Sequence, residues 1–93
     1  MIRILLADDQ PLLLSALETI LDAQDDITVA ATAADGAEAV EKARAHRIDV
    51  AVLDIRMPVL DGIAAARTIM ELGPRVIMPV SYTHLTLPTI LLV

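Results

Sequence analysis

The chain has 93 residues, a net charge of −6 and no cysteine, with 56% hydrophobic and 22% charged residues. One small domain fits this length, and the composition excludes disordered, collagen-like and coiled-coil chains, disulfide frameworks, thiolate zinc sites and thiol catalysis. The acidic balance argues against nucleic-acid binding by this segment, and the lack of a long apolar run or a basic leader predicts a cytoplasmic protein without membrane contact.

The hydrophobic pattern alternates between short apolar runs and stripes with helical spacing. The first run stops at Asp8-Asp9, which is typical of a buried parallel strand, and Pro11 suits the first position of a following helix. Asp35, with Glu38 three residues later, predicts the start of a second helix. In chain order, the predicted elements are strand 1–7, a helix from 11 that is broken at 25–26, strand 27–32, helix 36–46, strand 49–53, helix 62–72 ended by Gly73-Pro74, and strand 75–78.

This alternation predicts an α/β fold, with a parallel sheet, helices on both faces and right-handed crossovers. In such a sheet, ligands bind at the carboxyl ends of the strands, where the strand order reverses. Asp8 and Asp9 follow the first predicted strand, and Asp54 ends the third. If the strand order is 2-1-3, these three carboxylates converge.

Each aspartate also has a simpler structural interpretation. A single aspartate after a strand is usually a helix cap, and Asp9 fits that role just before Pro11. Three converging carboxylates repel one another, however, and one takes up a proton unless a cation compensates. Mg²⁺ is the natural partner, since it prefers oxygen ligands, and a carboxylate beside it can attack phosphorus and form an aspartyl phosphate.

Three segments carry a family resemblance. They are 6–11 (LADDQP), 34–39 (ADGAEA) and 52–62 (VLDIRMPVLDG), and together they strongly resemble response-regulator receiver domains. The likeness covers residues 1–78 and is strongest to receivers that precede a helix-turn-helix output domain in NarL/FixJ-type two-component transcription regulators. It implies the CheY-like, flavodoxin-like doubly wound fold, with a parallel sheet of order 2-1-3-4-5 that is incomplete here after the fourth strand.

The resemblance assigns a role to each site residue. Asp54 would be the phosphoacceptor, Asp8 and Asp9 would position Mg²⁺, with Asp9 the more direct, and the backbone carbonyl of Arg56 would complete the metal site. The pocket loop would be shaped by Met57, Pro58, Asp61 and Gly62.

The resemblance also implies partners. A sensor histidine kinase would donate the phosphoryl group, and DNA would be contacted only through a missing C-terminal output domain. The chain itself would be a phosphorelay component and not an enzyme, and the resemblance leaves dimerisation open.

The likeness stops near Met78. A receiver continues with a hydroxyl residue, a fourth helix, a fifth strand that carries a lysine, and a fifth helix. Here Val80 stands where the hydroxyl residue is expected, Ser81 comes one step late, and no lysine follows Lys42. We therefore expect a partial receiver domain at 1–79 and a non-native tail at 80–93, and we expect phosphorylation not to produce switching.

The tail has a specific explanation. Residues 80–89 are what GTC TCT TAT ACA CAT CTG ACG CTG CCG ACG encodes, and that DNA resembles the transposase-end adapter of sequencing libraries. A variable index followed by GTG TAG would account for residues 90–93 and a stop. The structural alternative is a fifth strand within 85–93, although no crossover helix precedes it. We expect an uncovered sheet face, an open edge at the fourth strand and poor stability.

Two other functional classes use similar folds. An Mg²⁺-dependent phosphohydrolase commonly has a second aspartate two positions after its nucleophile, whereas Asp54 is followed by Arg56. A nucleotide-binding module needs a glycine-rich loop after its first strand, where this chain has Asp-Asp-Gln-Pro. A non-functional truncated fragment is the remaining alternative.

Overall fold

The structure, a computed structural model, describes residues 1–54, 60–79 and 89–92. Strands and helices alternate along the chain until the last two elements, which are both strands. The elements are β1 (Ile2–Ala7), α1 (Pro11–Asp22), β2 (Ile27–Ala33), α2 (Gly36–Ala45), β3 (Val50–Leu53), α3 (Gly62–Glu71), β4 (Arg75–Pro79) and β5 (Thr89–Leu92).

The strands form one sheet of order β2-β1-β3-β4-β5. The first four strands are parallel, as the sequence predicts, and β3 lies directly beside β1. The expectation of an open edge at β4 is wrong, because β5 pairs with β4 in the antiparallel direction. An antiparallel return suits a connection shorter than the dozen or so residues that a parallel crossover needs. The sequence alternative of a fifth strand in the tail therefore holds for Thr89–Leu92.

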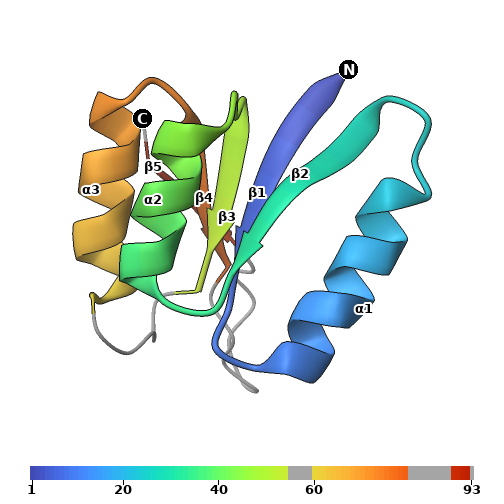
Figure 1. Ribbon diagram of the computed structural model, residues 1–93, viewed down its shortest axis with the longest axis horizontal. Coiled ribbons are helices and arrows are strands. Elements are labelled where there is room, and N and C mark those ends of the chain that lie inside the picture. The colour runs from blue at the N-terminus through green and yellow to red at the C-terminus, as the bar shows by residue number, and fades with distance from the viewer. Residues whose placement is uncertain (55–59, 80–88, 93) are drawn as a thin grey trace.

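Helices α2 and α3 cover one face of the sheet and, in the described part of the chain, α1 lies against the opposite face (Figure 1). The main core lies on the side of α2 and α3, where alternate residues of β1, β3 and β4 are buried. Its members are Leu5, Ala7, Ala33, Ala39, Val40, Ala43, Ile48, Ala51, Leu53, Ala65, Ala66, Ile69, Val76 and Met78. Small alanines on both helices allow close packing to the sheet.

The opposite layer is thinner. None of the residues of α1, all of which are described, is buried, and Leu13 in its apolar stripe is 40% exposed. A cavity of about 260 Å³ separates this stripe from the sheet and is lined by Leu17 and Leu21 of α1 and by Leu6 and Val52 of the sheet.

The pairing of β1 with β2 contains a β-bulge. Ile4 stands opposite Val29, but the next residue, Leu5, stands opposite Ala31, so Ala30 is an extra residue in β2. Both alanines of the bulge pack against the main core. Past the bulge, the register brings the end of β2 level with the end of β1.

Short polar contacts set the helix ends. Asp35 caps α2 by accepting a hydrogen bond from the Glu38 amide at 2.8 Å, as the sequence predicts. Gly73, just after α3, has φ of 118°, a conformation that glycine adopts with little steric cost.

The longest described helix, α1, has 12 residues, and no helix in the described ranges has the length and apolar character of a membrane span.

Candidate functional site

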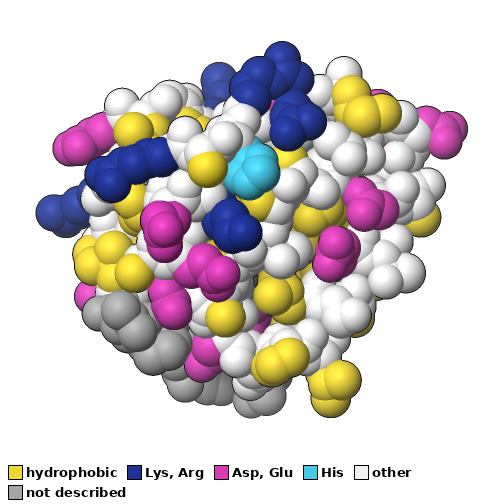
Figure 2. Space-filling view, in the orientation of Figure 1, with side chains coloured by type: hydrophobic (Ala, Val, Ile, Leu, Met, Phe, Trp, Pro, Cys, Tyr) yellow, Lys and Arg dark blue, Asp and Glu magenta, His cyan; other side chains and the backbone are white. Residues whose placement is uncertain are grey.

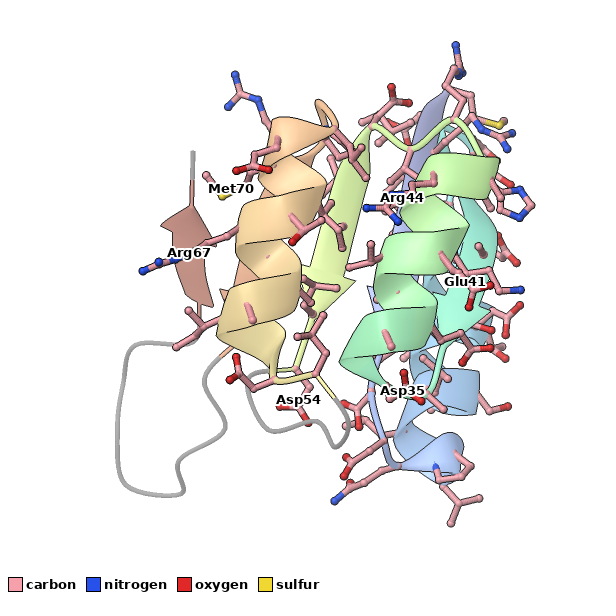
Figure 3. The ribbon with its side chains drawn as sticks, turned by 60° about the vertical axis from the view of Figure 1, so that its left-hand side comes forward. Asp35, Glu41, Arg44, Asp54, Arg67 and Met70 are labelled. Carbon is pink, nitrogen blue, oxygen red and sulfur yellow. The ribbon has the colours of Figure 1, made fainter. Side chains whose placement is uncertain are left out.

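Three carboxylates meet at the carboxyl ends of two adjacent strands. Asp8 and Asp9 follow β1, Asp54 follows β3, and one carboxylate oxygen from each lies within 4.8 Å of the others. The convergence follows from the strand order, because Ala7 and Leu53 are partners in the β1–β3 register. Figure 3 shows Asp54 at the lower end of the sheet, the end at which α2 begins with Asp35.

Backbone hydrogen bonds hold this edge of the sheet. The Asp8 amide donates to the Ala33 carbonyl of β2 at 3.1 Å, and the Asp54 amide donates to the Ala7 carbonyl of β1 at 3.0 Å. The ends of three strands are thereby joined where the carboxylates project. Small changes in side-chain conformation therefore leave the backbone of the cluster in place.

The three side chains differ in burial. Asp8 is 9% exposed, Asp54 is half-buried and Asp9 is exposed. The Gln10 amide donates to Oδ1 of Asp8 at 2.9 Å. At the start of α1, the N-cap is Gln10, whose side chain makes no capping hydrogen bond within the described residues. Asp9 is therefore not the helix cap that the simpler interpretation offered.

The surroundings of Asp8 disfavour its negative charge. Burial raises the pKa of the Asp8 carboxyl, and the carboxylates of Asp54 and Asp9 raise it further, while the Gln10 amide acts in the opposite direction. A cation among the three oxygens would remove both the repulsion and the cost of burial. An all-oxygen donor set fits Mg²⁺, which retains several water ligands and takes only a few carboxylates from a protein.

The charge on the surface is unevenly distributed. In Figure 2, lysine and arginine side chains gather in the upper half of the visible face, away from the carboxyl ends of the strands. Among the described residues of this face, the cations lie at the opposite end of the sheet from the acidic cluster. Such a distribution favours the approach of a divalent cation.

The other predicted site residues fall into two groups. Asp61 and Gly62 lie at the start of α3, where Asp61 accepts a hydrogen bond from the Ala64 amide at 2.8 Å and is not part of the carboxylate cluster. Arg56, Met57 and Pro58 lie outside the described residues.

One contact near the site was missed by sequence reasoning. The backbone of Leu60, at the far end of the segment that follows Asp54, lies against Gly36 at the start of α2. The signal available in the sequence was the Asp35-Gly36 pair, which was interpreted as a helix start and as part of the family resemblance, but not as a contact with the segment after Asp54.

Comparison with known proteins shows which family this chain is similar to. A family model described as the response regulator receiver domain matches residues 4–88. A protein-glutamate methylesterase/protein-glutamine glutaminase of Nitrosospira multiformis is 47% identical over 81 residues, which is 87% of this chain and 23% of that protein. The chain thus spans less than a quarter of this curated relative.

Two solved structures share the fold. The response regulator domain of Thermotoga maritima CheB is 46% identical, with a TM-score of 0.80 over 84% of this chain and 59% of that one. The receiver domain of NarL from Mycobacterium tuberculosis is 35% identical, with a TM-score of 0.82 over 89% of this chain and 68% of that one.

Proposed function

This chain belongs to the response regulator receiver domain family, and from that membership we propose that it accepts a phosphoryl group on Asp54 from a sensor histidine kinase. The observation that carries the proposal is the meeting of Asp8, Asp9 and Asp54 at adjacent strand ends. The family comparison supports a non-catalytic receiver rather than an enzyme in this segment.

The chemistry is an in-line transfer. An oxygen of the Asp54 carboxylate attacks phosphorus, a P–O bond forms, and the P–N bond to the kinase histidine breaks with its electron pair leaving on nitrogen. Bound Mg²⁺ would neutralise charge on the transferring phosphoryl oxygens. Asp8 and Asp9 would hold that ion, with the carbonyl of Arg56 proposed as a further ligand. Asp61 and Gly62 would support the pocket loop, together with Met57 and Pro58.

The test is phosphorylation of the full chain. Incubation with acetyl phosphate and Mg²⁺ should add the mass of one phosphoryl group, and Asp54→Asn should abolish the gain. Asp26→Asn is the matched control, since Asp26 lies before β2 at the other end of the sheet and its carbonyl accepts from the Ile2 amide. A gain that persists in Asp54→Asn would overturn the assignment. Continuous release of phosphate from many substrates would instead favour a phosphohydrolase.

The relatives suggest two different output domains for the protein that contains this receiver. The sequence resemblance pointed to a DNA-binding output domain, and the likeness to the NarL receiver supports it. The higher identity to the methylesterase favours a methylesterase output, which we propose as the leading candidate. Sequencing the locus beyond codon 78 distinguishes the two, because the two output domains differ entirely.

We propose that 80–93 is a translated adapter, although the family match extends to residue 88. Genomic DNA that reads continuously through these codons without adapter sequence would overturn it.

A further inference from the structure

We propose that the cavity between α1 and the sheet binds a linear primary alkylammonium ion, with the hydrocarbon chain among leucines and the ammonium group at Asp8 and Asp54. The cavity measures about 260 Å³, and its described lining combines an apolar wall with these two carboxylates. The inference goes beyond the proposed function, because neither Mg²⁺ nor phosphoryl transfer requires an apolar cavity.

Strand alternation brings the two carboxylates to the cavity. Leu6 and Val52 are partners in the β1–β3 register, and both line the cavity. Asp8 and Asp54 each follow two residues later, and side chains two positions apart along a strand share a face. The Asp54 amide, which donates to the Ala7 carbonyl, continues this ladder past the end of β3. Both carboxylates therefore lie on the α1 side of the sheet, at one end of the cavity.

Helix α1 supplies the apolar wall. The lining residues on the helix side form a stripe with helical spacing, which consists of Leu13, Leu14, Leu17 and Leu21. Opposite them Leu6 is buried, but none of the α1 leucines is, so apolar surface stays accessible inside the cavity. A smaller apolar cavity, of about 150 Å³, stays dry and binds a molecule the size of benzene. The size and lining of this cavity therefore favour an apolar occupant over water.

The lining extends along the helix. Leu13 lies in the first turn of α1, just after the acidic pair, and Leu21 lies in its last turn. These two positions are about 12 Å apart along a helix axis, at about 1.5 Å per residue. An elongated occupant with a polar group at one end suits such a lining, which favours a linear chain.

Charge determines which polar group this end accepts. Among the described residues that line the cavity there is no lysine, arginine or histidine. One carboxylate oxygen of Asp8 and one of Asp54 lie within 4.8 Å of each other. An ammonium nitrogen lies about 2.8 Å from each oxygen to which it donates, so a single ammonium group can reach both. A carboxylate or phosphate at the same place would be repelled.

The experiment is a titration of the metal-free full chain with hexylammonium, followed by methyl NMR. The leucine methyl signals of the cavity should shift and saturate. From butylammonium to hexylammonium, each added methylene should lower the dissociation constant about fourfold, as burial of one methylene does. Hexanoate, which has the opposite charge, should bind at least about tenfold more weakly. An affinity that is independent of chain length, or equal for hexanoate, would overturn the inference.

Two tryptophan variants locate the binding site. Leu17→Trp places a larger side chain in the cavity and should raise the hexylammonium dissociation constant at least about tenfold. Leu12→Trp is the matched control on the same helix, since Leu12 is 88% exposed and does not line the cavity, and it should bind as wild type does. Leu21→Trp replaces Leu17→Trp if that variant does not fold. Wild-type affinity in a folded cavity variant would overturn the inference, and if neither folds, the chain-length series in the wild-type chain decides.

Competition with Mg²⁺ tests where the ammonium group lies. Because both ligands would use Asp8 and Asp54, each should raise the apparent dissociation constant of the other by the same factor. Hexylammonium that leaves the affinity for Mg²⁺ unchanged would overturn the placement of its ammonium group. A chain that binds hexylammonium but no Mg²⁺ would support this inference and overturn the proposed metal site.

Discussion

The amide of Asp54 donates a hydrogen bond to the carbonyl oxygen of Ala7 at 3.0 Å, which ties the proposed phosphoacceptor to the residue that precedes the acidic pair. The spacing of the Asp8 and Asp54 carboxylates is therefore set by the backbone of β1 and β3. Substitutions that keep side-chain shape should change the charge of the site while preserving its geometry. The effect of each charge on stability and on metal binding can therefore be measured one substitution at a time.

Asp8→Asn should stabilise the metal-free protein at pH 7. The change removes a buried negative charge that faces Asp54 and Asp9, and the amide oxygen of asparagine can still accept from Gln10. Urea unfolding in the presence of a chelator measures the effect.

Addition of Mg²⁺ provides the complementary measurement. Mg²⁺ should stabilise the wild-type chain, by about 2.7 kcal/mol at one hundred times its dissociation constant, and should stabilise Asp8→Asn far less. Asp26→Asn is the control, since Asp26 lies at the other end of the sheet and its removal should leave metal-free stability and the response to Mg²⁺ nearly unchanged. A metal-free Asp8→Asn that is less stable than wild type would contradict the prediction.

The stability difference between wild type and Asp8→Asn should depend on pH. The pKa of Asp8 is raised in the folded state, so the folded protein holds this proton more tightly than the unfolded chain does. The resulting contribution to stability is fully present below the usual pKa of aspartate and is lost as pH rises through the raised value. Metal-free wild type should therefore lose stability relative to Asp8→Asn from about pH 4 upward. Parallel curves for the two proteins across this range would contradict the raised pKa.

Removal of the α2 cap should lower stability without changing the charges of the cluster. Asp35→Ala loses the hydrogen bond to the Glu38 amide and should cost about 1 kcal/mol, or roughly 4–8 °C in Tm. Asp35→Asn keeps an acceptor and should lie close to wild type. Equal melting temperatures for the alanine and asparagine variants would show that the cap contributes nothing.

Local patterns explain which features the sequence predicts. Apolar runs that end in acidic residues locate β1 and β3, and Asp35 locates the start of α2, because these signals depend only on near neighbours. Convergence of Asp8 and Asp54 required the additional assumption of strand order, which the structure confirms.

Features that depend on distant contacts were missed. The need for glycine at position 36 arises from Leu60, which is far away in sequence and close only after folding. The pairing of β5 with β4 was expected to be absent, because no crossover helix was found, whereas an antiparallel return needs none. The simpler interpretation of Asp9 as the cap of α1 is wrong, because the N-cap is Gln10, whose amide donates a hydrogen bond to Asp8.

Helix α1 should be the least protected helix in amide hydrogen exchange. No residue of α1, which is described throughout, is buried, whereas α2 and α3 each bury four. Local opening of α1 therefore exposes little additional core, and its amides should exchange at least about tenfold faster than those of α3. Leu12→Lys, at a side chain that is 88% exposed, should leave this difference unchanged. Equal protection of α1 and α3 would show that another contact covers the leucine stripe.

The extra residue at Ala30 carries a consequence for insertions and deletions in this domain. Removal of Ala30 would leave Val29 and Ala31 opposite Ile4 and Leu5, so the ladder would become regular and the later residues of β2 would keep their partners. Loss of a regularly paired residue past the bulge, such as Thr32, would instead shift the start of α2 by about 3.3 Å and reverse the facing of the residue that follows. Gly36 would then no longer stand opposite Leu60. The domain should therefore tolerate deletion of Ala30 better than deletion of Thr32.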